Sequence, residues 1–217
     1  MNLLDVATMK IRDLFEQDTD KHITFCFGRF NPPTLGHKKL FDTMKSQGGD
    51  MKIFTTQSQD SKKNPLDYAT KVDFLRKIHS DYANNIIENT NLNTITKVCA
   101  SLYDEGYRHI TFVAGDDRLE NMKKLIKDYN GKTEGKKGPL EDTYKFETMD
   151  FVSAGAREDG SDGVEGISGT LAREDAANND IKKFTKHTGA GEHAEELFAA
   201  VRKGMGLSDE KPEDDQE

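Results

Sequence analysis

A stretch of ten residues, Gly28 to His37, contains the residue types and spacing that could hold a phosphate group. It follows the apolar run Ile23–Phe27 and precedes the amphipathic run Lys38–Met44, which predicts a strand, a tight Gly/Pro loop and a helix. Gly36 and the histidine after it then lie at the mouth of this helix. The first N–H groups of a helix are unpaired and carry a partial positive charge, so an anion is favoured there. With an arginine and two prolines beside it, this mouth is expected to hold a phosphate rigidly.

A second candidate for anion binding lies between Glu165 and Arg173. Ser168 can cap a helix whose first N–H groups face an anion, and Thr170 adds a hydroxyl. Arg173, one turn later, can bind two phosphate oxygens through its forked guanidinium. The alternative is an ordinary helix cap with a surface arginine, and the residues taken alone favour it.

Two further polar segments follow predicted strands. The segment Val113–Arg118 predicts a helix start at which Asp116 caps the helix and Asp117 complements its dipole. Lys62 and Lys63 lie in a polar loop that is either a solvated turn or a clamp on a phosphate.

The stretch Gly28–His37 resembles the signature of the nucleotidylyltransferase superfamily, Gly-x-Phe-x-Pro-x-(His or Thr)-x-Gly-His after the first strand. The segment Ile167–Arg173 is similar to the second signature, Ile-Ser-x-Thr-x-x-Arg, which clamps the β- and γ-phosphates of the bound trinucleotide. The superfamily often has Gly-x-Asp at the end of the fourth strand, where this chain has the run Gly115-Asp116-Asp117. Together with the string Lys63–Leu66, these forms are similar to phage-encoded cytidylyltransferase-like proteins over roughly residues 22 to 185.

The resemblance implies transfer of an AMP or CMP group from ATP or CTP to a phosphorylated small-molecule acceptor, with release of pyrophosphate. His37 is then expected to donate to the α-phosphate, and Thr34, in place of the family's first histidine, to bind the same phosphate through its hydroxyl. Arg173 completes the catalytic set by holding the pyrophosphate portion. The residues expected to bind the nucleotide are Gly28, Arg29, Phe30, Gly36, Gly115, Asp116, Ile167, Ser168 and Thr170. Lys62 and Lys63, with Arg29 on the same side, are expected to hold the acceptor. Mg²⁺ is expected as a cofactor bound mainly by phosphates and water, without dedicated protein ligands.

Strand and helix patterns alternate along the chain and predict an α/β fold. The expected architecture is a Rossmann-like, doubly wound, five-stranded parallel sheet with extra N- and C-terminal helices. The expected strands are 22–27, 51–56, 85–88, 108–114 and 144–152, with helices near 36–46, 68–78, 95–103 and 117–129 between them. The expected domains are an N-terminal helix (1–20), the nucleotidylyltransferase domain (21–186), a C-terminal helix (187–207) and a disordered acidic tail (208–217).

Composition narrows the class of protein. Of 217 residues, 34% are hydrophobic and 32% are charged, and the net charge is −8. The last ten residues contain six acids and one lysine, so the remainder is close to neutral, and general nucleic-acid binding is not expected. Cys26 and Cys99 are expected to be buried free thiols, and no apolar run is long enough to span a membrane. The cytoplasm, or the host cytoplasm for a phage protein, is the expected compartment. His22, His79 and His109 are expected at strand ends or exposed positions.

Several alternatives stay open. Nicotinamide mononucleotide, phosphopantetheine, glycerol phosphate and choline phosphate all fit related loops, and neither ATP nor CTP is favoured. The chain has no tryptophan, which removes the aromatic platform of many pyridine-nucleotide members. A homo-oligomer also stays open. The rival interpretation is a catalytically silent nucleotide-binding or structural module on the same fold.

Overall fold

Four apolar runs form the parallel sheet of the α/β fold, in the order β2-β1-β3-β6 within the described part of the chain. The computed structural model describes residues 21–155 and 168–207. The strands are β1 (His22–Gly28), β2 (Asp50–Thr55), β3 (His109–Ala114) and β6 (Thr148–Ser153). β1 and β3 pair in parallel, with His22 opposite His109, as do β3 and β6, with His109 opposite Thr148. The predicted Rossmann-like α/β fold is confirmed, with four parallel strands among the described residues and the expected fifth strand not confirmed.

Helices connect the strands and continue after the last of them. They are α2 (Gly36–Ser46), α3 (Tyr68–Ile78), α4 (Ile95–Asp104), α5 (Asp116–Tyr129), α6 (Gly169–Ala177), α7 (Ile181–Thr188) and α8 (Ala194–Gly204). Two 3-10 helices, η1 (Ser80–Asn85) and η3 (Gly191–His193), and a short antiparallel ribbon of β4 (Glu134–Gly135) and β5 (Gly138–Pro139) complete the described elements. The predicted N-terminal helix, the acidic tail and Ile167 lie outside the described residues.

The described chain divides into two compact units, which we call the sheet unit and the helical unit. The sheet unit comprises residues 21–27, 42–54 and 89–155, and the helical unit comprises residues 28–41, 55–88 and 168–207. The chain therefore passes from one unit to the other within α2 and at the ends of β1 and β2. The expected division into residues 21–186 and 187–207 stays a prediction.

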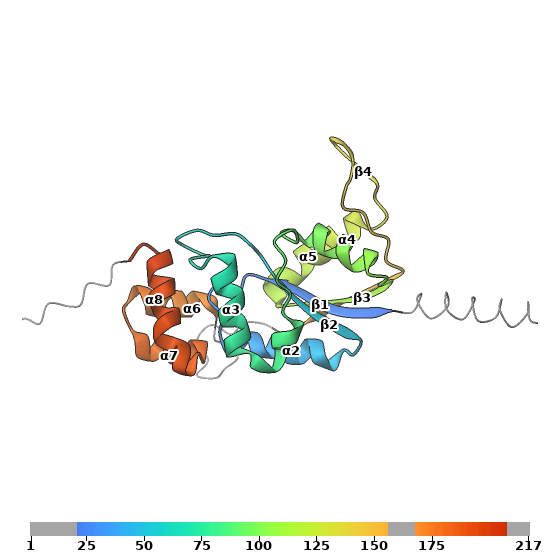
Figure 1. The fold of residues 1–217 in the computed structure, drawn as a ribbon. Helices are drawn as coiled ribbons and strands as arrows, with labels where there is room; N and C mark the ends of the chain where they lie inside the picture. The colour runs from blue at the N-terminus through green and yellow to red at the C-terminus, as the bar shows by residue number, and fades with distance from the viewer. Residues whose placement is uncertain (1–20, 156–167, 208–217) are drawn as a thin grey trace, which may run out of the picture. The chain divides into compact units, whose positions relative to one another are not determined.

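The sheet unit is built around aromatic side chains on its strands. Phe25 on β1 lies edge-on to Phe112 on β3, with ring centroids 5.3 Å apart, and 6.3 Å from Phe54 on β2. All three are buried, as near-continuous apolar strands of parallel sheets usually are. α4 and α5 cover one face of this sheet, and the β4–β5 ribbon projects away from it (Figure 1). Cys26 and Cys99 are buried and free, as predicted, and burial raises the pKa of both thiols.

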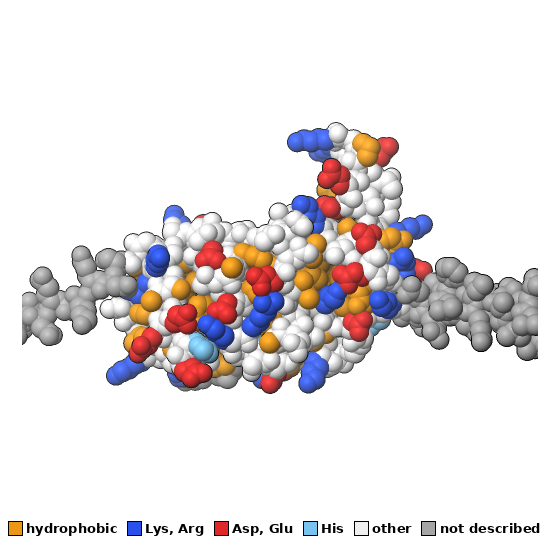
Figure 2. Space-filling model, in the orientation of Figure 1, with side chains coloured by type: hydrophobic (Ala, Val, Ile, Leu, Met, Phe, Trp, Pro, Cys, Tyr) orange, Lys and Arg blue, Asp and Glu red, His pale blue; other side chains and the backbone are white. Residues whose placement is uncertain are grey.

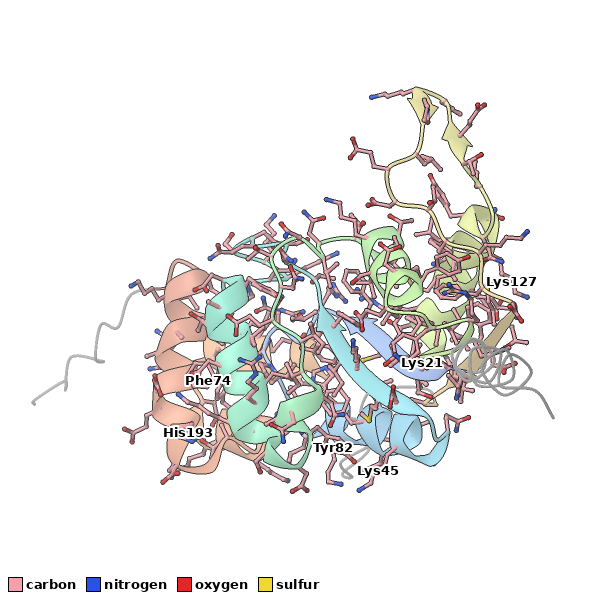
Figure 3. All side chains as sticks on the ribbon, turned by 45° about the vertical axis from the view of Figure 1, so that its right-hand side comes forward. Lys21, Lys45, Phe74, Tyr82, Lys127 and His193 are labelled. Atoms are coloured by element: carbon pink, nitrogen blue, oxygen red, sulfur yellow. The ribbon has the colours of Figure 1, made fainter. Side chains whose placement is uncertain are left out.

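The helical unit has its own apolar core, formed by α3 together with α6, α7 and α8. Phe74 on α3 belongs to this core and lies on the side of α3 that faces α8 (Figure 3). Phe184 on α7 and Phe198 on α8 pack edge-on, with ring centroids 5.1 Å apart. On the outer side, Lys77 pairs with Asp73 across 2.7 Å. Basic and acidic side chains are interspersed over the face drawn in Figure 2.

The predicted strand over residues 85–88 is not confirmed: Ile86 takes part only in an isolated β-bridge, its N–H donates to the Ala83 carbonyl across 3.3 Å, and its carbonyl accepts from a side chain. The chain forms the 3-10 helix Ser80–Asn85 instead. Arg76 on α3 then donates from Nη2 to the carbonyl of Ile86 across 3.0 Å and pairs through Nη1 with Glu88 across 2.7 Å. An apolar pair between polar residues predicts a strand, but only tertiary contacts decide whether a neighbouring strand is available.

The last sheet strand begins four residues later than predicted. Tyr144 and Phe146 are buried, but they precede β6. The Asn130 side chain takes the place of a neighbouring strand, because it accepts from the Phe146 N–H across 2.8 Å and donates to the Phe146 carbonyl across 3.1 Å. Tyr144 donates its hydroxyl to the carbonyl of Ile126 across 3.0 Å. The apolar pattern predicted burial correctly and the type of element incorrectly.

Candidate functional site

The loop between β1 and α2 begins with a close approach between Gly28 and Phe30. Phe30 has a φ of 45°, a left-handed conformation that is rare for a bulky residue and is often found at functional sites. This conformation turns the Phe30 ring over Gly28, where a Cβ atom would lie 2.4 Å from the ring's Cζ. Glycine at position 28 is therefore required by the phenyl ring. Whether Gly28 also contacts the nucleotide stays a prediction.

The Phe30 ring also supports His37 at the start of α2. The two rings meet edge-on with centroids 4.8 Å apart, and the Phe41 ring lies tilted against Phe30 with centroids 5.6 Å apart. Phe30 and Phe41 are buried, whereas His37 is partly exposed. The motif phenylalanine thus orients the imidazole by packing.

Hydrogen bonds from Thr34 determine which nitrogen of His37 carries the proton. The Thr34 backbone N–H donates to Nδ1 of His37 across 2.9 Å, and the Thr34 hydroxyl lies 3.1 Å from the same nitrogen. An N–H group can only donate, so Nδ1 is an acceptor and the neutral ring carries its proton on Nε2. Nε2 is then a hydrogen-bond donor, the role that an oxygen with developing negative charge requires.

The backbone of Thr34 is in turn contacted by His79, a histidine that was expected at a strand end or an exposed position. Thr34 is fully buried, and its carbonyl lies 3.1 Å from Nε2 of His79. His79 ends α3, is 5% exposed and packs edge-on against Phe41 at 5.0 Å. The expectation that His79 is exposed is wrong, because the residue ends a helix whose last turn faces the motif loop. His79 acts here as a support for the Thr34 backbone.

The second signature reaches the same loop through the N-terminus of α6. Ser168 caps this helix, as predicted, by accepting the N–H of Leu171 across 3.3 Å. At Gly169 a Cβ atom would lie 3.4 Å from the carbonyl oxygens of both Asn31 and Pro32, so this helix start lies against the motif backbone. Any larger residue at Gly169 would tighten this contact.

Arg173 links α6 to the motif loop directly. Its Nη1 donates to the Asn31 carbonyl across 2.7 Å, and its Nη2 donates to the Thr170 hydroxyl across 3.1 Å. The side chain is half-buried, while Thr170 is exposed. The guanidinium is therefore held in a fixed orientation at the point where the two signatures meet.

Asn31 is a site residue that the sequence analysis missed. It is 2% exposed, and its side chain binds both backbone groups of Leu66, donating to the carbonyl across 2.9 Å and accepting from the N–H across 3.0 Å. An amide side chain flanked by Phe30 and two prolines is a detectable signal. A polar group in such an apolar setting must be buried with hydrogen-bond partners.

Lys62 and Lys63 occupy a turn that Asp60 organises. Oδ1 of Asp60 accepts the backbone N–H groups of Lys62 and Lys63, across 2.9 and 2.7 Å, and Oδ2 accepts the Asn64 amide. The Lys63 N–H and the Asn64 side chain lower the pKa of this carboxyl to about 2. Both lysine side chains are exposed on this turn, and Oδ1 of Asn64 is buried without a partner among the described residues.

The remaining predicted residues lie at different places. Gly28, Arg29 and Gly36 belong to the motif loop of the helical unit, where the Thr55 hydroxyl donates to the Arg29 carbonyl across 3.4 Å. Gly115 and Asp116 belong to the sheet unit, and Ile167 lies outside the described residues.

Asp116 does not cap α5, contrary to the prediction. Gly115 occupies the cap position without a side-chain hydrogen bond, and Asp116 is the first residue of the helix. Its carboxylate accepts the hydroxyl of Ser153 at the end of β6. The carbonyl of Ala114 accepts the Ala154 N–H across 2.9 Å, so the ends of β3 and β6 are fastened together. Asp116 thus binds Ser153 of the neighbouring strand instead of capping the helix. A single sequence does not reveal this partner.

Neither a metal cluster nor a membrane span is found in the part of the chain that the structure describes. Residues 21–155 and 168–207 contain no group of three or more His, Cys, Asp or Glu side chains that could hold a metal. None of the described helices is long and apolar enough to cross a membrane. Mg²⁺ bound through ligand phosphates stays a prediction.

A parallel α/β sheet whose first strand leads into a Gly-Arg-Phe-Asn-Pro-Pro loop, with a histidine at the following helix mouth, defines a Rossmann-like nucleotidyltransferase. The cytidylyltransferase-like family model matches residues 25–158, more than half of the chain, and the chain belongs to this family. No curated protein gives a significant match.

Solved structures similar to the chain include two adenylyltransferases. One is a protein assigned as a nicotinate-nucleotide adenylyltransferase from Vibrio parahaemolyticus, with 19% identity and a TM-score of 0.46 over 82% of this chain and 99% of the other. The second is the nicotinic acid mononucleotide adenylyltransferase of Plasmodium falciparum complexed with NaAD. It has 15% identity and a TM-score of 0.45 over 84% of this chain and 95% of the other.

Proposed function

We propose that this nucleotidyltransferase moves an AMP or CMP group from ATP or CTP to a phosphorylated small molecule, in the cytoplasm. The observation that carries the proposal is the hydrogen bond from Arg173 to the Asn31 carbonyl, because it joins the two signatures in one unit. An anion held by the capped start of α6 would then lie beside the helix mouth that carries His37.

The reaction needs positioning and charge stabilisation more than a protein nucleophile. An oxygen of the acceptor phosphate forms a bond to the α-phosphorus of the trinucleotide, and the bond from that phosphorus to the pyrophosphate oxygen breaks. The acceptor oxygen is already anionic, so no general base has to remove a proton. The departing pyrophosphate takes the electron pair of the broken bond, and Mg²⁺ held by the phosphates and water would offset its charge.

The residues of the helical unit divide these tasks. His37, with its proton on Nε2, donates to the α-phosphate oxygen as charge develops there. Ser168, Thr170 and Arg173 hold the β- and γ-phosphates through the helix N-terminus and the guanidinium fork. Lys62 and Lys63, exposed on the Asp60 turn, meet the acceptor phosphate when it binds.

The alternative is a module that binds nucleotide without turnover. The pair of His37 and Arg173 favours the enzyme, because a purely structural descendant does not need both a donor at the helix mouth and a guanidinium beside it. Both proposals predict nucleotide binding, so only turnover separates them.

The test is pyrophosphate release from ATP and from CTP with Mg²⁺ and a panel of phosphorylated acceptors. The panel comprises nicotinamide mononucleotide, phosphopantetheine, glycerol phosphate and choline phosphate. We expect release that depends on one acceptor and on one trinucleotide. Tight trinucleotide binding with no release for any acceptor would favour the silent module.

A further inference from the structure

A lysine of α3 lies buried behind the start of the motif loop. Lys71 is fully buried, and its ammonium donates to the carbonyl of Thr56, the residue after β2. The N–H of Thr56 donates to the carbonyl of Gly28 across 2.9 Å. The charge of Lys71 is therefore two hydrogen bonds away from the first residue of the signature loop, and all three residues belong to the helical unit.

Lys71 has no carboxylate partner within residues 21–155 and 168–207. The Thr56 carbonyl is the acceptor that its ammonium contacts there, although an ammonium has three hydrogens to donate. The charge of Asp67 acts on Lys71, but the Asp67 carboxylate caps α3 and accepts the N–H and the hydroxyl of Thr70, across 2.9 and 2.7 Å. Burial lowers the pKa of Lys71 to about 8 in spite of Asp67.

A second polar group beside Lys71 is also unsatisfied. The hydroxyl oxygen of Thr56 is buried and has no hydrogen-bond partner among the described residues. Buried polar atoms almost always have partners, and a buried ammonium without a counter-ion is one of the costliest arrangements in a protein. A buried cation and an unpaired hydroxyl close to Gly28 therefore favour the binding of an anion at this loop.

We propose that Lys71 supplies the buried positive charge that binds the phosphate-bearing substrate at the Gly28–His37 loop. This inference rests on the proposed function and adds a residue that neither signature contains. In the absence of substrate the buried charge of Lys71 lowers the stability of the fold. A bound phosphate compensates this charge. Lys71 acts across the Thr56 backbone, so its effect on the substrate is electrostatic.

The test compares Lys71→Met with Lys77→Met. Both changes remove one lysine from α3, but Lys77 is partly exposed and pairs with Asp73 and Glu196. Binding of pyrophosphate, of ATP and CTP with Mg²⁺, and of the acceptor that supports turnover is measured by calorimetry at one salt concentration, and melting temperature is measured without ligand. A structural role predicts that stability and affinity fall together, whereas the proposal predicts opposite changes.

We expect Lys71→Met to weaken phosphate binding about tenfold or more, the effect of roughly 1.4 kcal/mol, and to leave the melting temperature unchanged or higher. Lys77→Met should leave affinity within about twofold, and Lys71→Arg, which keeps the charge, should restore much of it. If Lys71→Met weakens the binding of pyrophosphate, the charge of Lys71 acts on the phosphates of the trinucleotide. Weakening that appears only with the acceptor that supports turnover places it at the acceptor phosphate.

Two results would overturn the inference while leaving the proposed function intact. One is a Lys71→Met chain that binds pyrophosphate, both trinucleotides and the acceptor as the wild type does. The other is a Lys71→Met chain that fails to fold or melts several degrees lower. If the wild-type chain binds neither trinucleotide nor pyrophosphate, the proposed function itself fails.

Discussion

Arg173 donates from Nη1 to the backbone carbonyl of Asn31 across 2.7 Å, although the two residues lie 142 positions apart in the chain. The side chain of the same Asn31 binds both backbone groups of Leu66. One buried residue of the first signature thus connects the second signature with the segment that follows the Asp60 turn. The fixed orientation of the proposed phosphate clamp depends on this residue.

Asn31→Ala is expected to lower the free energy of unfolding by about 1–3 kcal/mol, because it leaves the buried N–H and carbonyl of Leu66 without partners. Urea unfolding measures the change. Asn84→Ala is the matched control, since Asn84 is exposed on η1, and it should change stability by less than about 0.5 kcal/mol. Equal effects at the two positions would show that the Asn31 side chain does not hold the Leu66 segment.

Gly28→Ala is expected to destabilise the fold by about 1–3 kcal/mol, because the new methyl group would lie 2.4 Å from the Phe30 ring. The cost should depend on the ring. In a double-mutant cycle with Phe30→Leu, the double variant should lose less stability than the sum of the single variants. Additive losses would mean that Gly28 is required for another reason.

Thr34→Val separates two roles for the Thr34 hydroxyl. The hydroxyl lies 3.1 Å from Nδ1 of His37, so we expect its loss to disturb the imidazole and to lower kcat about five- to tenfold, as loss of one hydrogen bond of about 1 kcal/mol does. Trinucleotide affinity should stay close to that of the wild type, and Thr34→Ser should keep most of the rate. A loss of affinity with unchanged kcat would instead show that the hydroxyl binds the phosphate itself, as the family resemblance implies.

The sequence was sufficient to predict the elements that local patterns determine. The strand before Gly28, the helix start at Gly36 and the cap at Ser168 follow from apolar runs and cap residues, and the structure confirms them. At residues 85–88 and at Asp116 the structure differs from the expectation where the side chain of another element binds a backbone carbonyl or the carboxylate. Such competition depends on tertiary contacts that one sequence does not contain.

The support of the site was harder to predict than its signature residues. Asn31, Lys71 and His79 act through hydrogen bonds to main-chain groups of the motif loop and its neighbours. A hydrogen bond to a main-chain group does not require a particular residue type at the partner position. The sequence therefore contains no signal that His79 contacts Thr34. A lysine in the apolar stripe of α3 was the one visible signal for Lys71.

The stability of the wild type relative to Lys71→Met should depend on pH. The pKa of Lys71 is about 8 in the folded chain and near 10.5 when the chain is unfolded, so between these values the unfolded chain binds more protons. Folding stability therefore rises with pH from about 8 to 10.5, and the cost of burying the charge, on the order of 3 kcal/mol, is fully present below pH 8. Urea unfolding at pH 7 and pH 10 should show the advantage of Lys71→Met shrinking at the higher pH. An advantage that is unchanged or larger at pH 10 would contradict this assignment.

The central claim is that His37, oriented by Thr34 and Phe30, stabilises the α-phosphate during nucleotidyl transfer. The most direct measurement is pyrophosphate release by the wild type and by His37→Ala, with the acceptor that supports turnover and with trinucleotide binding measured on the same samples. We predict that His37→Ala loses roughly 10²–10³ in kcat, as removal of one transition-state donor does, while trinucleotide affinity changes little. Equal turnover in the two proteins would contradict the account.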